Sequence, residues 1–322
     1  MNRYYYGKSG KGDYTKEDLP ETRWQLFWEM LRVRFSALFK LNVMYAVAWL
    51  PAIIVIGRAL MLGFSGLNNL AQLQEQAAAG EIAMEVLETM SGDFFEAVKA
   101  IVLQTLLLLV PCLALTGPAT AGISYVTRNW ARDEHAFVWS DFVDALKANW
   151  KQALITSAIT GCVPLLLYVC TLFYGEMART SVVFMLPMVL CLMMGILWLM
   201  SLLYMYPQMV TYDLTYKHLV RNSLIMVIGR LPMTVGLKLL SLVPALICAA
   251  VCLFTPYALY AILIYGVYYA VIGFALSRFV AASYANAVFD RYLNINIEGA
   301  EVGRGLYKEE ENDLDEDESA EF

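Results

Sequence analysis

Six long apolar segments alternate along this chain with shorter polar stretches. They cover residues 41–62, 98–115, 153–174, 181–206, 232–254 and 257–279. Each is close to the roughly 20 residues that a helix needs to cross a hydrocarbon core about 30 Å thick. The pattern therefore predicts an all-α fold, a polytopic membrane helical bundle with six transmembrane helices in three hairpins.

Positive charge is unevenly distributed between the loops that join these segments. Of the 23 Lys and Arg residues, 8 precede the first segment, 4 lie between the second and third, 4 lie between the fourth and the body of the fifth, and 4 follow Ala275. The remaining three are Arg58, Lys99 and Arg179. Because loops rich in Lys and Arg stay in the cytoplasm, this bias predicts a multi-pass protein with both termini cytoplasmic.

A cytoplasmic amphipathic helix is predicted before each pair of apolar segments. Thr22 and Gln25 have the spacing of a capping box. The apolar residues that follow recur at helical spacing and form one stripe: Trp24, Phe27, Trp28, Leu31, Phe35 and Leu38. Ser140 and Asp213 are predicted to cap the second and third helices, and Gly229 to end the third, just before Pro232. Such helices lie in the membrane interface. Either an internal threefold repeat or the general tendency of basic loops to form amphipathic helices explains the recurrence.

The domain organisation follows from these segments. Residues 1–21 are predicted to be a flexible cytoplasmic N-terminus, residues 22–297 a membrane domain, and residues 298–322 a disordered acidic tail, since nine of the 29 acidic residues lie between Glu309 and Glu321. Residues 63–97 form an acidic outer segment, with helices broken near Gly80. Tail and outer segment are either solvated surfaces or docking sites for partners.

The composition offers little for catalysis. With 59% apolar and 16% charged residues and a mean hydropathy of +0.55, the chain is unlike an ordinary soluble domain. No cluster of acid, base or nucleophile is visible, and neither His135 nor His218 has a second ligand at metal-binding spacing. We therefore expect no enzyme activity, no cofactor and no metal. The six cysteines are interpreted as packing residues within the apolar segments: Cys112, Cys162, Cys170, Cys191, Cys248 and Cys252.

A few polar residues stand within or beside the apolar segments. Arg58 either reaches toward the outer interface or makes an ion pair or anion contact inside the bundle. The others are expected to make hydrogen bonds between helices, with a small polar cavity as the alternative. They are Asn42, Gln104, Thr105, Ser157 and Thr160.

The run from Thr116 through Gly117 and Pro118 to Gly122 predicts a break in the chain's helical structure. Thr116 suits a helix cap, Gly117 a bend and Pro118 the first turn of a new helix. Exposed amides at that new start would favour an anion or a partner's carbonyl group, whereas a plain change of helix direction needs no ligand.

Two stretches of the chain resemble the bacterial YesL-like membrane protein family, itself a domain of unknown function. The first stretch is residues 116–154, and the resemblance there lies in Gly117-Pro118-Ala119, Arg128, Trp139-Ser140-Asp141-Phe142 and Lys147 to Asn149. The second stretch is residues 214–232, and the resemblance there lies in Asn222-Ser223-Leu224. The resemblance implies a multispanning protein of the bacterial plasma membrane, accessory to carbohydrate uptake. The candidate contacts to a partner or ligand are Thr116, Gly117, Pro118, Arg128, Trp139, Asp141, Phe142, Lys147, Asn149, Asn222 and Arg58.

Two functions remain open at this point. The first is a non-enzymatic accessory or assembly factor linked to carbohydrate uptake or sensing, which contacts a sugar transporter permease or a membrane sensor through its cytoplasmic helices. The second is a small-solute transporter or channel. Membrane lipids are expected partners in either case, self-association is compatible with both, and nucleic acid is not an expected partner.

Overall fold

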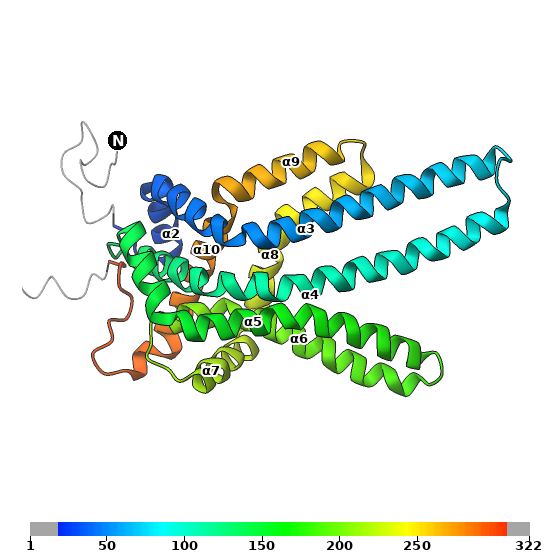
Figure 1. The fold of residues 1–322 in the computed structure, drawn as a ribbon. Coiled ribbons are helices and arrows are strands. Elements are labelled where there is room, and N and C mark those ends of the chain that lie inside the picture. The colour runs from blue at the N-terminus through cyan, green and yellow to red at the C-terminus, as the bar shows by residue number, and fades with distance from the viewer. Residues whose placement is uncertain (1–18, 308–322) are drawn as a thin grey trace, which may run out of the picture. The chain divides into compact units, whose positions relative to one another are not determined.

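A computed structural model of the chain describes residues 19–307, which contain helices and no strands (Figure 1). The α-helices are α2 (Arg23–Val33), α3 (Phe35–Ala78), α4 (Met84–Trp130), α5 (Val138–Ala178), α6 (Met185–Met209), α7 (Tyr216–Gly229), α8 (Leu231–Phe254), α9 (Ala258–Tyr268) and α10 (Phe274–Tyr292). Short 3-10 helices cover Val182–Phe184 and Asn294–Asn296, and a π-helical segment, η3, covers Tyr269–Gly273.

Six helical segments in the described range are long and apolar enough to cross a membrane. They are Phe35–Ala78, Met84–Trp130, Val138–Ala178, Val182–Met209, Leu231–Phe254 and Ala258–Asn296. Each covers one of the six apolar segments read from the sequence, to within one residue. Most of their apolar side chains are exposed, as expected for helices whose natural surroundings are lipid. The predicted all-helical membrane architecture is confirmed at this level.

The described residues fall into two compact units. The first comprises residues 19–45, 120–149 and 202–307, and the second comprises residues 46–119 and 150–201. The largest buried side chains belong to the first unit and come from five helices: Leu26 and Met30 of α2, Tyr45 of α3, Trp130 of α4, Tyr204 of α6, and Phe279 and Phe289 of α10. This core fixes the surfaces described below.

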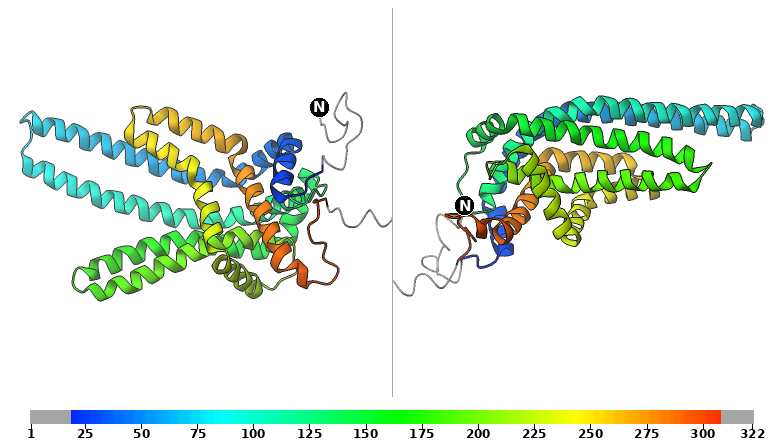
Figure 2. Two further views of the ribbon diagram at one scale, coloured as in Figure 1. Left: turned by 180° about the vertical axis from the view of Figure 1, so that it is seen from behind. Right: turned by 90° about the horizontal axis from the view of Figure 1, so that it is seen from below.

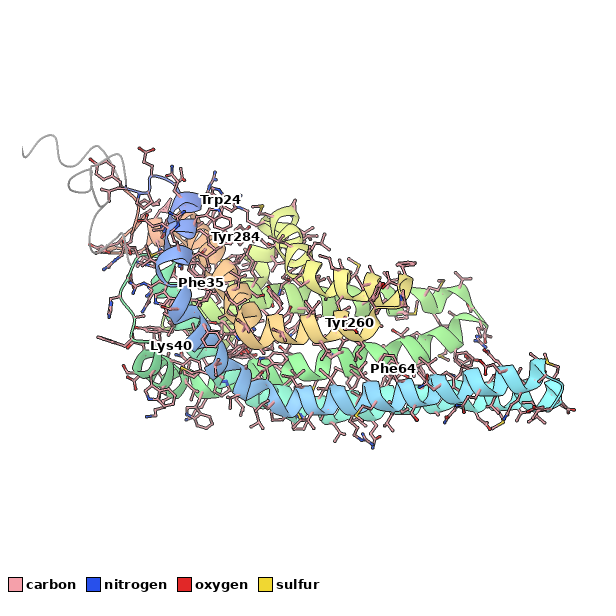
Figure 3. The ribbon with its side chains drawn as sticks, turned by 90° about the horizontal axis from the view of Figure 1, so that it is seen from above. Trp24, Phe35, Lys40, Phe64, Tyr260 and Tyr284 are labelled. Carbon is pink, nitrogen blue, oxygen red and sulfur yellow. The ribbon has the colours of Figure 1, made fainter. Side chains whose placement is uncertain are left out.

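Helix α2 begins with the predicted capping box and leaves most of the predicted aromatic stripe outside the protein core. The Thr22 side chain accepts a hydrogen bond from the Gln25 amide and the Gln25 side chain from the Thr22 amide, which confirms the capping box. The buried side chains of α2 are Leu26 and Met30, which are not part of the stripe, and Leu38 of the stripe is buried on α3. Trp24 and Trp28 are exposed, as is Phe35 after the break at Arg34 (Figure 3). The aromatic side chains therefore form the outer face of this segment.

The two other predicted caps are wrong. Helix α5 begins at Val138, before Ser140, because the Asp141 carboxylate accepts a hydrogen bond of 2.8 Å from the Phe137 amide and so satisfies the first turn. Thr215, not Asp213, precedes α7. The end of α7 at Gly229 and the place of Pro232 in the first turn of α8 are confirmed.

The predicted terminal and outer segments are only partly described. In the second unit, α3 and α4 extend through most of residues 63–97 and are separated at Gly80, whose φ of +76° suits glycine, so the predicted break is confirmed. Residues 298–307, predicted to belong to a disordered tail, pack instead: the Tyr307 amide donates to the Pro20 carbonyl and the Gly303 amide to Asp290. Residues 1–18 and 308–322 lie outside the described range.

The last apolar segment is not one continuous α-helix. Between α9 and α10 the chain changes direction at η3 (Figure 2). The side chain of Asn42, fully buried on α3, donates to the carbonyls of Tyr269 and Ala270 at 2.9 and 2.8 Å and accepts from the amide of Ala275 at 2.9 Å. A side chain inserted into a helix ladder is a recognised cause of bending. Asn42 therefore satisfies the backbone groups that the bend takes out of the α-helical pattern.

Replacing Asn42 by Leu should destabilise the protein, because three backbone groups of the last apolar segment would lose their partner. Each buried group left without a partner costs about 1–3 kcal/mol. We expect the free energy of unfolding, measured by SDS titration in mixed micelles, to fall by at least about 2 kcal/mol. Thr105→Val is the control, since Thr105 bonds only to the Ile101 carbonyl of its own helix. Equal stability of the Asn42 variant and the wild type would contradict this role.

Candidate binding surface at the α4–α5 corner

The turn between α4 and α5 lies in the first unit and holds most of the predicted contact residues. We call residues 128–149 the α4–α5 corner. Helix α4 ends at Trp130 and the chain reverses through Asp133, whose φ of +56° is tolerated by aspartate better than by branched side chains. The amides of Arg132 and Glu134 both donate to the Asn129 carbonyl, and the Asn286 side chain donates to the Arg128 carbonyl. The end of α4 is thus closed by hydrogen bonds.

One carboxylate organises the charges of the corner. Glu134 lies 3.3 Å from Arg128, 2.9 Å from Arg132 and 3.3 Å from Arg304. The Glu134 side chain is only 17% exposed, so these ion pairs are screened less by solvent than surface pairs. Because Arg304 follows α10, this carboxylate ties the corner to the C-terminal part of the described chain.

A second carboxylate, Asp290 on α10, holds the neighbouring segments. It pairs with Arg23 of α2 and accepts a hydrogen bond of 2.6 Å from Asn294, whose side-chain oxygen accepts from the Tyr212 hydroxyl at 2.6 Å. Burial and the nearby Asp290 charge raise the pKa of Tyr212 to about 12. Arg23 also donates to the carbonyl of Arg304 at 2.9 Å. The corner therefore rests on a connected polar network rather than on a loose loop.

Against this fixed backbone, two large aromatic side chains are exposed. Phe137 is 67% and Trp139 is 70% exposed, and the ring of His135 packs edge-on against Phe137 at 4.6 Å. Lys147, farther along α5, is exposed as well. Exposed tryptophan beside mixed charge is typical of protein interfaces and of membrane interfaces.

The corner brings together six of the predicted contact residues: Arg128, Trp139, Asp141, Phe142, Lys147 and Asn149. They have different roles. Arg128 is held by Glu134, Asp141 accepts from the Phe137 amide, and the Asn149 side chain donates to the Ala145 carbonyl. Phe142 is buried against α4, where a Cβ on Gly122 would lie 2.7 Å from its carbonyl oxygen. The structure therefore places the Phe142 side chain inside the protein and not on its surface.

The other predicted residues lie elsewhere. Asn222 is half-buried on α7. In the second unit, Arg58 is exposed and donates to the Gln104 side chain at 3.2 Å, with no carboxylate in ion-pair distance among the described residues. The interhelical hydrogen bonds predicted for the polar residues of the spans are present for Asn42, Gln104, Ser157 and Thr160.

The predicted helix break at Thr116, Gly117 and Pro118 is wrong, since α4 continues to Trp130. Thr116 donates to the Leu113 carbonyl within the same helix. Pro118 has no amide hydrogen for the Ala114 carbonyl, four residues earlier, but the Ser157 hydroxyl lies 2.8 Å from that oxygen. Gly117 lets α5 come so close that a Cβ there would lie 2.3 Å from the Ala153 carbonyl. Close packing thus replaces the expected break, and no free helix start exists at this place.

Sequence reasoning missed the residues that hold the corner in place. The sequence did not mark Glu134 and Asp290 as the residues that join distant segments, because Arg304 and Arg23, the partners that make these links, are far away in the chain. The excess of Lys and Arg in the loops predicted to be cytoplasmic was the available signal, and it does not show which residues pair.

Together, the apolar helices and the polar corner define the class of the molecule as an integral, multi-pass helical membrane protein. Residues 94–170 are similar to a family described as "Protein of unknown function, DUF624". The matched region includes the corner and the Gly117–Pro118 contact with α5. The searches of curated proteins and of solved structures gave no match. Among the described residues, no three His, Cys, Asp or Glu side chains are grouped as metal ligands.

Gly117→Ala should destabilise the second unit. The added methyl group would lie 2.1 Å from the Ser157 hydroxyl and 2.3 Å from the Ala153 carbonyl oxygen, and the backbone cannot give way as a flexible side chain would. We expect a loss of about 1–3 kcal/mol, seen as a lower Tm in detergent. Gly57→Ala on α3 is the matched control, because no atom lies within 4 Å of a Cβ at Gly57. Equal Tm values for the two variants would contradict the close contact of α4 and α5.

Proposed function

We propose that this chain is a non-enzymatic accessory or assembly protein of the bacterial plasma membrane. It binds a subunit of a carbohydrate transporter, or a membrane sensor, through the α4–α5 corner. In this proposal the six apolar helices form three hairpins, and the corner and both termini face the cytoplasm, as the distribution of Lys and Arg favours. The resemblance to the YesL-like family supports the link with carbohydrate uptake.

The exposed Trp139 on a fixed corner is the observation that carries this proposal. Tryptophan in a rigid setting gives much contact area at little cost in conformational entropy, and such residues dominate binding energies in protein interfaces. The Glu134 ion pairs and the buried Phe142 hold the backbone on both sides of Trp139. A partner can therefore bind without first ordering the loop.

A small-solute transporter or channel is the second candidate. The observation that favours it is η3, because transporters commonly build their solute sites from interrupted helices. In that case the purified chain alone should move solute across liposome membranes.

The test of the accessory function compares two equally exposed tryptophans, Trp139 and Trp24, which are 70% and 68% exposed. A photo-crosslinking amino acid is placed at each position in cells, and the adducts are identified by mass spectrometry. We expect the probe at position 139 to capture a sugar transporter permease or a membrane sensor, and the probe at position 24 to capture lipid alone. Trp139→Ala should weaken the purified complex by about 2 kcal/mol, roughly 30-fold, whereas Trp24→Ala should not.

Two results would oppose the accessory function. One is lipid as the sole adduct at both positions, which would make Trp139 a membrane anchor. The other is solute flux by the purified chain in liposomes with no complex recovered from cells, which would favour the transporter.

A further inference from the structure

Two cations in the first unit stand apart from the ion pairs of the corner. They are Lys238 on α8 and Arg278 on α10, both half-buried and both within the segments that are apolar enough to cross a membrane. Charged side chains in such segments are costly and mark functional sites more often than surface charges do. Their surroundings therefore matter more than those of the exposed lysines and arginines.

Arg278 is held in place by hydroxyl groups and rings. Its Nη2 donates to the Tyr45 hydroxyl oxygen at 3.3 Å, and that hydroxyl lies 2.8 Å from the Thr120 hydroxyl. The guanidinium also lies 5.9 Å from the ring centre of Tyr45 and 5.6 Å from that of Tyr206. These contacts position the group and stabilise its charge weakly, but they supply no negative charge.

The helix that carries Lys238, α8, meets α6 and α10 through hydroxyl groups. Lys238 follows Thr234 by one turn on the same face of α8, and the buried Thr234 hydroxyl lies 2.8 Å from the Tyr204 hydroxyl of α6. Tyr204 in turn contacts Tyr284 of α10, labelled in Figure 3, with 3.5 Å between the hydroxyl oxygens. The Tyr204 hydroxyl thus joins α8 to α10, with Lys238 one turn beyond Thr234 on α8 and Arg278 less than two turns before Tyr284 on α10. The charges of Lys238 and Arg278 repel each other.

No acidic group compensates this pair within the part of the chain that the structure describes. All ion pairs found there involve other residues, and neither Lys238 nor Arg278 has a carboxylate within 4.0 Å. By contrast, Arg23, Arg128 and Arg132 each pair with Glu134 or Asp290. Two like charges near each other in a medium of low dielectric constant are unfavourable unless a negative charge lies between them.

We propose that Lys238 and Arg278 bind an anionic oxygen group, a phosphate in its simplest form, with the hydroxyls of Tyr45 and Thr120 beside it. Arginine and lysine donors give the charge-assisted hydrogen bonds that phosphate oxygens accept. The phosphate belongs either to the headgroup of an anionic lipid or to a small anion in solution. This site is separate from the α4–α5 corner and goes beyond the proposed accessory function.

The experiment uses the full-length protein in phosphatidylcholine nanodiscs, with two probes. The first is phosphatidylglycerol added to the nanodiscs, with bound lipid counted by native mass spectrometry. The second is inorganic phosphate, with binding followed by the Tm. The variants are Lys238→Gln and Arg278→Gln, and the matched control is Arg221→Gln, which removes an exposed arginine of α7. Loss of one charge-assisted hydrogen bond should weaken binding about tenfold or more.

Each result has a defined meaning. One retained phosphatidylglycerol per wild-type and Arg221→Gln chain, lost in both site variants, supports the site and assigns it to a lipid headgroup. A saturable rise in Tm with phosphate, absent from both site variants, supports the site and assigns it to a soluble anion. Binding of neither probe, or equal binding by wild type and site variants, overturns the proposal.

A further variant distinguishes an anion site from a structural role of the lysine. Lys238→Met removes the repulsion with Arg278 and keeps the side chain's apolar length. We expect its Tm without added anion to equal or exceed that of the wild type, and its response to anion to disappear. A Tm lowered equally with and without anion would show that Lys238 is needed for folding, and would overturn the proposal.

Discussion

Backbone polar groups cannot be left without hydrogen bonds inside an apolar bundle, and this constraint shapes both units of the chain. The apolar helices depart from a regular ladder of hydrogen bonds at η3 and at the prolines within them. At η3 the side chain of Asn42 binds two carbonyls and one amide of the bend. At Pro118, which has no amide hydrogen, the Ser157 hydroxyl donates to the Ala114 carbonyl instead. At these two places a polar side chain from another helix binds the freed backbone groups and brings the two helices into contact.

The same requirement separates the charged residues into two groups. At the α4–α5 corner, Glu134 and Asp290 neutralise the arginines around them and link α2, α4 and α10. In the apolar segments, Arg278 has a hydroxyl and aromatic rings as neighbours, and neither Arg278 nor Lys238 has a carboxylate within 4.0 Å among the described residues. The first group stabilises the surface of the corner. The second group, Lys238 and Arg278, forms the anion site that we propose.

Much of the architecture could be predicted from the sequence because apolar length and charge distribution are local properties. The six apolar helices, the capping box of Thr22 and the end of α7 at Gly229 all follow from short patterns. The errors concern residues whose conformation is decided by distant partners. Gly117 and Pro118 have the sequence pattern of a helix break, but the helix continues there because α5 packs against it. Phe142 was predicted to be a contact residue, but it packs against α4 at Gly122.

The candidate site shows the same division. Trp139 could be chosen from the sequence because it lies in the stretch of residues 116–154 that resembles the YesL-like family, which is a local signal. The pairing of Glu134 with Arg304 could not, since 170 positions separate them and no local pattern relates the two. The bend at η3 was missed for the same reason, because it depends on Asn42 in a helix near the other end of the chain.

The most direct test of the account is the side of the membrane on which the corner lies, because partner binding in the cytoplasm requires it. In a background without the six native cysteines, Trp139→Cys and Glu81→Cys would be treated with a membrane-impermeant maleimide in intact spheroplasts and after lysis. The account predicts that the cysteine at position 81 reacts in intact cells and the one at position 139 only after lysis. Labelling of position 139 in intact cells would contradict it.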